Sequence, residues 1–163
     1  MITQERLHEL FEYREDGNLI RKVSTAKRTK VGDIAGWMSP RGYFMVSINS
    51  KKYLVHRMIF LYHHGYLTPG MELDHIDGNP RNNRIENLRE VTKSQNIQNS
   101  KIRSDNTTGV KGVYWDKSNS KWQVQMRMKG KLKYLGRYTT LKEAKAVVKE
   151  AREKYHGEYG RHK

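Results

Sequence analysis

Charge is distributed unevenly along this sequence, and that distribution limits how the chain can fold. Residues 101–163 hold 17 Lys and Arg against 6 Asp and Glu, whereas residues 1–100 hold 15 against 11. The change falls close to Ser104–Gly109, a stretch made of residues that favour turns. We therefore expect two small domains, residues 1–103 and residues 110–163, joined by a linker at 104–109.

The net charge of +15 over 163 residues indicates a polyanionic partner, because Lys and Arg bind phosphates and release the counterions that surround them. Composition alone leaves a ribosomal-type or merely basic protein as an alternative. The chain has no cysteine, which excludes disulfides and thiolate zinc sites. The first residues lack the pattern of a signal peptide, and no apolar run approaches the length of a membrane span. We expect a cytoplasmic protein with no membrane partner.

Hydrophobic spacing predicts the elements of the first domain. Apolar residues recur at helical spacing from Leu54 to Tyr62, and Gly65 is placed to end that helix. The expected elements are a short helix around Leu7–Phe11, strands at Asn18–Val23, Tyr43–Ile48 and Lys52–Val55, the helix ending near Gly65, strands at Glu72–His75 and Leu88–Thr92, and a polar helix to about Lys101.

The second domain is predicted to contain three strands followed by one helix. The strands are expected at Gly112–Trp115, Lys121–Met128 and Lys131–Leu135, with turns at Asn119-Ser120 and Lys129-Gly130. The helix is expected from Leu141 to about Tyr155, where Thr140 and Glu143 have the spacing of a capping box. With the first domain, this gives an α+β protein.

An acid, a histidine and several carboxamides lie close together between residues 74 and 96. Cleavage of a phosphodiester needs an activated water and a cation that stabilises the transition-state charge. His75 suits the first task, and Asp74 and Asn96 supply oxygen atoms for a hard cation such as Mg²⁺. Neighbouring strand residues point to opposite faces, so Asp74 and His75 are expected to have different roles. Asn87 is placed to hydrogen-bond either the loop before it or the His75 side chain.

These residues resemble the HNH nuclease family, and its phage and intron-encoded homing members in particular. The matching segments are Val55-His56-Arg57-Met58, Asp74-His75-Ile76-Asp77-Gly78-Asn79, Asn82-Asn83 and Glu86-Asn87-Leu88-Arg89. The resemblance implies two short strands and a helix around one metal ion (the ββα-metal core, at about 71–101) and a phage-infected or bacterial host cell.

The resemblance also implies a role for each site residue. His75 would be the general base and Asp74 and Asn96 the metal ligands, while Asn87 would have an orienting role. The third residue of the H-N-H triplet is asparagine here, which favours Mg²⁺, with Mn²⁺ as the alternative. For His56, at the start of a helix, capping or core packing is the favoured interpretation.

The second domain resembles the ERF/APETALA-type DNA-binding domain, through Gly109–Trp115, Lys121–Arg127 and Leu135–Thr140. In the middle strand, apolar residues from Trp122 to Met128 alternate with Gln and basic residues, which indicates one face for the helix and one for DNA. The resemblance implies DNA contacts at Lys111, Tyr114, Gln125, Arg127 and Tyr134. Lys133 stands where a buried residue is usual, so the register of the third strand stays open.

Two functions remain as hypotheses. The first is a metal-dependent DNA endonuclease of the homing type, acting on double-stranded DNA as a monomer or a DNA-assembled dimer and making a nick or a double-strand cut. The alternative is a non-catalytic DNA-binding regulator that uses the C-terminal module. The basic run Arg21–Lys30 is equally consistent with a phosphate-binding arm and with a solvated loop.

Overall fold

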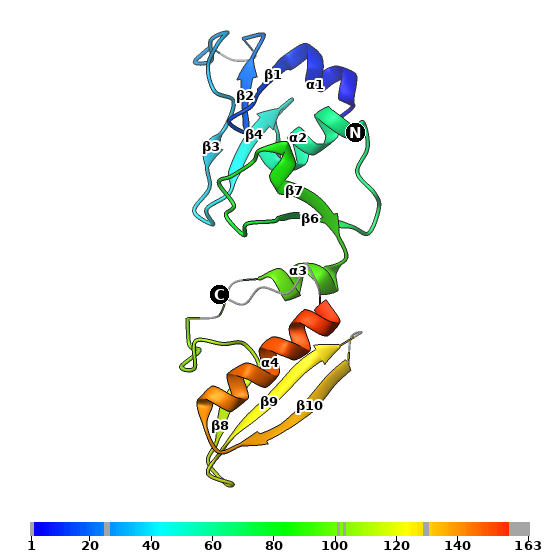
Figure 1. Ribbon diagram of the computed structural model, residues 1–163. Helices are drawn as coiled ribbons and strands as arrows, with labels where there is room; N and C mark the ends of the chain where they lie inside the picture. Colours follow the sequence, from blue (N-terminus) through cyan, green and yellow to red (C-terminus); the bar gives the residue numbers. More distant parts are fainter. Residues whose placement is uncertain (1, 25–26, 101, 103, 129–130, 157–163) are drawn as a thin grey trace. The chain divides into compact units, whose positions relative to one another are not determined.

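The computed structural model describes the chain except residues 1, 25–26, 101, 103, 129–130 and 157–163, and it divides into two compact units (Figure 1). Unit 1 is Met1–Thr92 and unit 2 is Lys93–Lys163. The division thus falls ahead of the turn-rich stretch at 104–109, so that the segment from Lys93 to residue 103 groups with unit 2. Its assignment to the nuclease domain remains a prediction.

Unit 1 combines short helices with three small antiparallel sheets, β1–β2, β3–β4–β5 and β6–β7. The mixed α+β class expected from the sequence is therefore confirmed. Its elements are α1 (Gln4–Leu10), β1 (Phe11–Arg14), β2 (Asn18–Arg21), β3 (Trp37–Met38), β4 (Phe44–Ile48), β5 (Lys51–Leu54), α2 (Val55–His64), β6 (Glu72–His75), the 3₁₀ turn η1 (Ile85–Asn87) and β7 (Leu88–Val91).

The core of unit 1 lies between α1, α2 and the neighbouring strands. Its most deeply buried residues, each no more than 1% exposed, are Leu7, Phe11, Leu19, Ala35, Val46 and Ile59. Helix α2 ends at Gly65, whose φ of 77° is a left-handed conformation that glycine adopts without strain. The turn between β4 and β5 uses Asn49 and Ser50 at positive φ, as a two-residue hairpin requires.

Strand β6 carries Asp74 and His75, and Asn87 lies on η1, directly before β7. Strands β6 and β7 pair antiparallel, with Asp74 opposite Arg89 and His75 opposite Leu88. A long polar loop joins them and ends in η1 (Figure 1). Since residues directly opposite in a sheet share a face, Asp74 and Arg89 lie on one side of this pair and His75 on the other.

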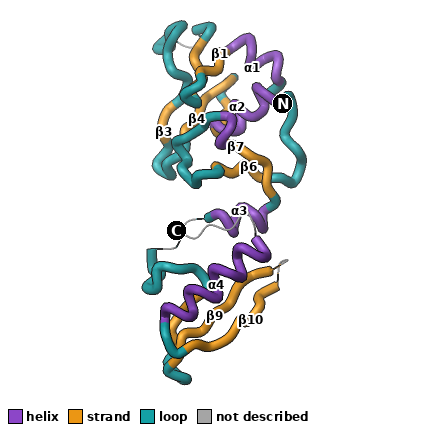
Figure 2. Tube along the Cα trace, in the orientation of Figure 1, coloured by secondary structure: helices purple, strands orange, loops and turns teal. Residues whose placement is uncertain are grey.

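Unit 2 contains α3 (Lys93–Asn99), β8 (Val113–Asp116), β9 (Lys121–Met128), β10 (Lys131–Tyr138) and α4 (Leu141–His156). The three strands form one antiparallel sheet in the order β10–β9–β8, and α4 lies along one face of it (Figure 2). Ala144 and Val148 of α4 pack with Val113 and Val124 of the sheet. The capping box forms, since Thr140 N–H donates to Glu143 and Glu143 N–H donates to the Thr140 hydroxyl.

The structure adds features that the sequence analysis did not foresee. Strands β1 and β3 were not expected, and β10 runs on to Tyr138 after a bulge between Tyr134 and Gly136. Lys133 is exposed and pairs with Met126. The turn expected at Lys129-Gly130 lies outside the described residues. Among the helices that are described, none has the length and hydropathy needed to cross a membrane.

Candidate active site

Asp74 and His75 are adjacent on β6 and both are nearly inaccessible, with 7% and 6% of their surface exposed. The Asp74 carboxylate accepts hydrogen bonds from Nε and Nη2 of Arg89, at 3.2 and 3.1 Å, through its Oδ2 atom. A buried carboxylate needs hydrogen-bond donors that compensate for lost hydration. The cross-strand register of β6 and β7 supplies Arg89 as such a donor.

His75 lies among aromatic rings and one buried amide. Its Nε2 atom is 3.0 Å from Oδ1 of Asn83, a residue that is only 3% exposed. The ring of His56 meets the His75 ring edge-on at 4.9 Å, and the ring of Tyr43 lies 6.3 Å away. Four separate segments therefore meet at the imidazole: β6, the start of α2, the residue before β4, and the loop before η1.

His56, the partner of His75 in this ring pair, is likewise buried, with 5% of its surface exposed. Burial lowers its pKa from 6.5 to about 3, and the charges of His75 and Arg57 act in the same direction. His56 is consequently neutral at physiological pH. Of the two interpretations of His56, helix capping and core packing, the structure supports core packing. The N-cap position of α2 is occupied by Leu54, and no side chain forms a capping hydrogen bond there.

Asn87 anchors the loop between β6 and β7. Its Nδ2 group donates to Asp77 Oδ1 at 3.0 Å and to the backbone oxygen of Asn82 at 2.8 Å, and its Oδ1 accepts from the Asp77 N–H at 3.1 Å. The backbone oxygen of Asn87 also accepts from Ile76 N–H. Of the two partners foreseen for Asn87, the loop is the one that the structure shows.

Asp77 is the charged centre of that loop. Burial acts to raise its pKa, but hydrogen bonds from Asn82, the Asn79 backbone and Asn87, with the charge of His75, outweigh it and hold the pKa below the usual value. The carboxylate therefore stays ionised and keeps the loop closed around it. This places Asp77 in a structural role next to His75.

Asn96 lies on α3 in unit 2, half-buried, and its pairing with Asp74 remains a prediction. In the described part of the chain, no three His, Cys, Asp or Glu side chains form a ready-made cation site. A Mg²⁺ ion needs fewer, since it keeps several waters and takes one or two protein ligands. The chemistry of Asp74 fits such an ion, because carboxylate oxygens are ligands that Mg²⁺ prefers.

A second group of sequence-predicted residues gathers on the face of the unit 2 sheet opposite α4. The register places Tyr114 opposite Gln123, Gln125 opposite Tyr134 and Arg127 opposite Leu132. Tyr114, Arg127 and Tyr134 are exposed. Four of the five expected DNA contacts thus share one surface.

Lys111, the fifth expected contact, lies elsewhere in unit 2. Its ammonium group donates to the backbone oxygens of Gln98 and Ser100 at the end of α3, where a cation complements the helix dipole. The backbone oxygen of Lys111 in turn accepts from the buried guanidinium of Arg152. The structure thus gives Lys111 a local bonding role beside the predicted one.

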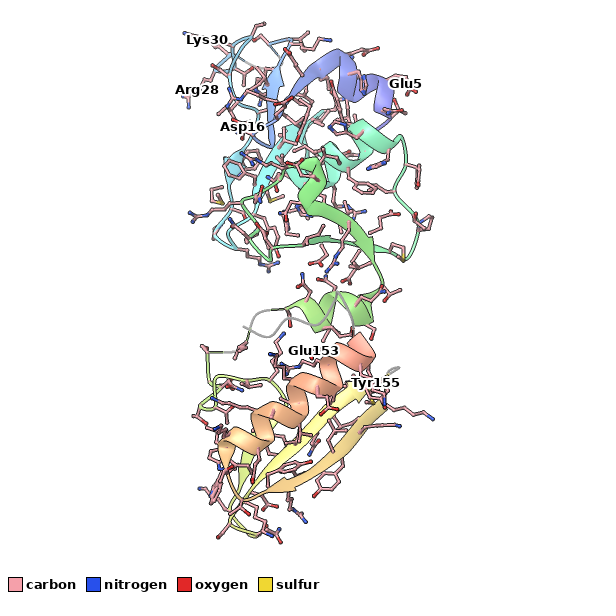
Figure 3. The ribbon with its side chains drawn as sticks, in the orientation of Figure 1. Glu5, Asp16, Arg28, Lys30, Glu153 and Tyr155 are labelled. Atoms are coloured by element: carbon pink, nitrogen blue, oxygen red, sulfur yellow. The ribbon has the colours of Figure 1, made fainter. Side chains whose placement is uncertain are left out.

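Some functional-site neighbours were missed by the sequence reasoning. Asn83 belongs to a quoted motif but was given no role, and Arg89 was noted without its partner. Tyr43 carries no local signal, since only the fold of β4 and α2 brings it near His75. Of the basic run, Arg28 and Lys30 lie on the loop between β2 and β3 (Figure 3).

Comparison with known proteins defines the class to which this fold and site belong. Residues 53–98 match the HNH endonuclease family. Protein 3.8 of Escherichia phage T7 is 35% identical over 97 residues, which cover 60% of this chain and 79% of that protein. The chain therefore belongs to the HNH endonuclease family.

Two further proteins are similar over different shares of their length. YosQ of Bacillus subtilis (strain 168), a SPbeta prophage-derived protein whose name assigns it to the HNH homing endonucleases, is 38% identical over 65 residues, 37% of this chain and 38% of that protein. A solved structure that describes DNA binding and cleavage by the HNH homing endonuclease I-HmuI is also similar. The match covers 88% of this chain and 76% of the I-HmuI chain, at 23% sequence identity and with a TM-score of 0.43.

Proposed function

We propose that the chain is a divalent-metal-dependent DNA endonuclease of the homing type. The observation that carries this proposal is the group Asp74, His75 and Asn87 on one short β6–β7 unit, with His75 and Asp74 on opposite faces. Membership of the HNH family and the similarity to YosQ support the same activity. The substrate would be double-stranded DNA, and the similarity to a phage T7 protein supports a phage-infected bacterial cell as the setting.

His75 would act as the general base in this reaction. It would take a proton from a water molecule whose oxygen forms a bond to phosphorus, while the ester bond from phosphorus to the leaving oxygen breaks. The His56 ring, neutral because burial lowers its pKa to about 3, adds no positive charge beside His75. A neutral imidazole is the form that accepts a proton.

Asp74 and Asn96 would hold the divalent cation, with Mg²⁺ favoured over softer metals by two oxygen donors. Bound there, such a cation would supply charge stabilisation for the phosphate. Arg89 would orient the Asp74 carboxylate through its two hydrogen bonds. Asn87 would act indirectly, by holding the loop that follows His75.

The open sheet face of unit 2 would bind DNA. Tyr114, Gln125, Arg127 and Tyr134 share that face, and amide, guanidinium and phenol groups suit base edges and phosphates. Residues 101–163, which hold an excess of 11 positive charges (17 against 6), favour a duplex partner. The alternative remains a DNA-binding regulator in which only this face acts.

Incubation with supercoiled plasmid and then with phage or host genomic DNA tests the proposal. The wild-type protein is expected to nick or linearise one of these DNAs with Mg²⁺ or Mn²⁺, and EDTA is expected to stop the reaction. His75→Ala should lose cleavage, whereas His64→Ala, a histidine near the end of α2, should retain it. DNA binding without cleavage on every substrate would favour the regulator.

A further inference from the structure

Asn83 is placed to control which nitrogen of His75 carries the proton. The Asn83 side chain is 3% exposed and the His75 ring 6% exposed, so the 3.0 Å contact between Oδ1 and Nε2 is shielded from water. A carboxamide oxygen accepts hydrogen bonds and donates none. With this oxygen facing the ring, the contact is a hydrogen bond in the tautomer that carries its proton on Nε2, and in that tautomer the lone pair of the neutral imidazole lies on Nδ1.

The backbone at Asn83 lies against the N-terminal β1–β2 hairpin, which is outside the segment that matches the HNH family. Gly17, in the turn between β1 and β2, has a φ of 85°, and a Cβ atom there would lie 2.7 Å from the Asn83 carbonyl carbon and 2.6 Å from Arg84 N. Two residues on, the Ile85 N–H donates to the Tyr13 hydroxyl at 3.1 Å. The hairpin therefore presses against the backbone on the C-terminal side of Asn83.

We propose that Asn83 is a positioning residue that fixes the tautomer of His75. This inference rests on the proposed function, since a general base must present its lone pair to water. In the opposite tautomer, Nδ1 would carry a hydrogen atom. It would point an N–H group at the water and could not accept the water's proton. Partners that orient a functional histidine in this way affect activity by about 10–100-fold in metal sites.

The test combines a direct reading of the tautomer with kinetics on the full-length chain. The ¹⁵N chemical shifts of the His75 ring would be recorded at a pH where the imidazole is neutral, with the signals assigned by their loss in His75→Ala. Three variants would be compared: Asn83→Leu, which removes the acceptor at similar volume; Asn83→Asp, which keeps it; and Asn79→Ala, at an exposed asparagine of the same loop whose side chain accepts from Arg81 N–H.

The wild-type protein and the Asn79→Ala and Asn83→Asp variants are expected to show His75 protonated at Nε2. Asn83→Leu is expected to show a mixture of tautomers, with kcat reduced about 10–100-fold and KM unchanged. If Asn83→Leu does not fold, Asn83→Asp still tests the assignment, because a carboxylate can only accept from Nε2.

Two results would overturn the proposal. One is His75 protonated at Nδ1 in the wild-type protein, which would mean that the amide nitrogen of Asn83 faces the ring. The other is a wild-type kcat in Asn83→Leu despite a mixed tautomer. A third result separates the two proposals. If the wild-type protein cuts no DNA but its His75 is protonated at Nε2 as expected, the proposed function is refuted, whereas the role of Asn83 in fixing the tautomer stands.

Discussion

Replacement of Asn87 by alanine is expected to loosen the β6–β7 loop and lower the stability of unit 1. The side chain is 8% exposed and makes three hydrogen bonds, of which one joins its amide to the Asp77 carboxylate. A neutral hydrogen bond contributes about 1 kcal/mol and one to a charged group about 1.5–3 kcal/mol. Because Asp77 itself is exposed, we discount the charged bond and expect a loss of about 3 kcal/mol.

This loss can be measured within unit 1 by urea unfolding, monitored through the backbone amide signals of Leu88–Val91. Asn79→Ala is the matched control, since its exposed side chain accepts one bond from Arg81 N–H, and its cost should stay below about 1 kcal/mol. Cleavage by Asn87→Ala should fall along with the order of the loop. An unchanged free energy of unfolding with lost cleavage would refute the loop-anchoring role and point to a direct one.

Three other substitutions have distinct expected outcomes. His56 has a pKa of about 3 in the folded protein, below its unfolded value of 6.5, so unfolding takes up a proton at acidic pH. The free energy of unfolding should therefore fall as the pH drops from about 6.5 towards 3. His56→Leu should flatten this dependence, as measured by urea titrations at several pH values. Ile59→Ala, at a fully buried site, should cost about 3 kcal/mol, whereas the exposed Ile76→Ala should change the free energy of unfolding by less than about 0.5 kcal/mol. Arg127→Ala should weaken DNA binding and reduce the salt slope of log K by about 1 in fluorescence anisotropy, and Lys142→Ala on α4 should not.

Each of these expectations can fail in a specific way. A pH profile of His56→Leu that matches the wild type would show that His56 does not remain neutral in the fold. Equal costs for Ile59→Ala and Ile76→Ala would contradict the described core of unit 1. An equal loss of affinity in Arg127→Ala and Lys142→Ala would show that charge alone, rather than the open sheet face, determines binding.

Local sequence signals were sufficient for the elements that carry the site. The boundaries of β6 were predicted to the residue, and α2 was predicted with its end at Gly65, because hydrophobic period and glycine position act over short distances. The capping box at Thr140 was likewise readable, since its two hydrogen bonds span three residues. Strand β1 alternates between more and less buried residues over only four positions, directly after a helix, and β3 has two exposed residues, so neither is long enough to be recognised from its pattern.

The residues around His75 were harder to assign from the sequence. Asp74 and His75 were singled out by composition and spacing, but their partners depend on pairing that a linear pattern does not contain. Arg89 meets Asp74 only through the β6–β7 register, and Asn83 meets His75 only because the loop folds back. The roles of Asn96 as metal ligand and of the unit 2 sheet as DNA surface stay predictions.

The most direct test of the nuclease assignment is to measure binding and cutting separately on the same duplex. Single-turnover cleavage rates and equilibrium affinities would be compared for the wild-type protein and His75→Ala, using a DNA that the wild type cuts in Mg²⁺ or Mn²⁺. We predict that His75→Ala binds with unchanged affinity and shows no measurable cleavage. A His75→Ala variant that cuts at the wild-type rate would contradict the assignment of His75 as the general base.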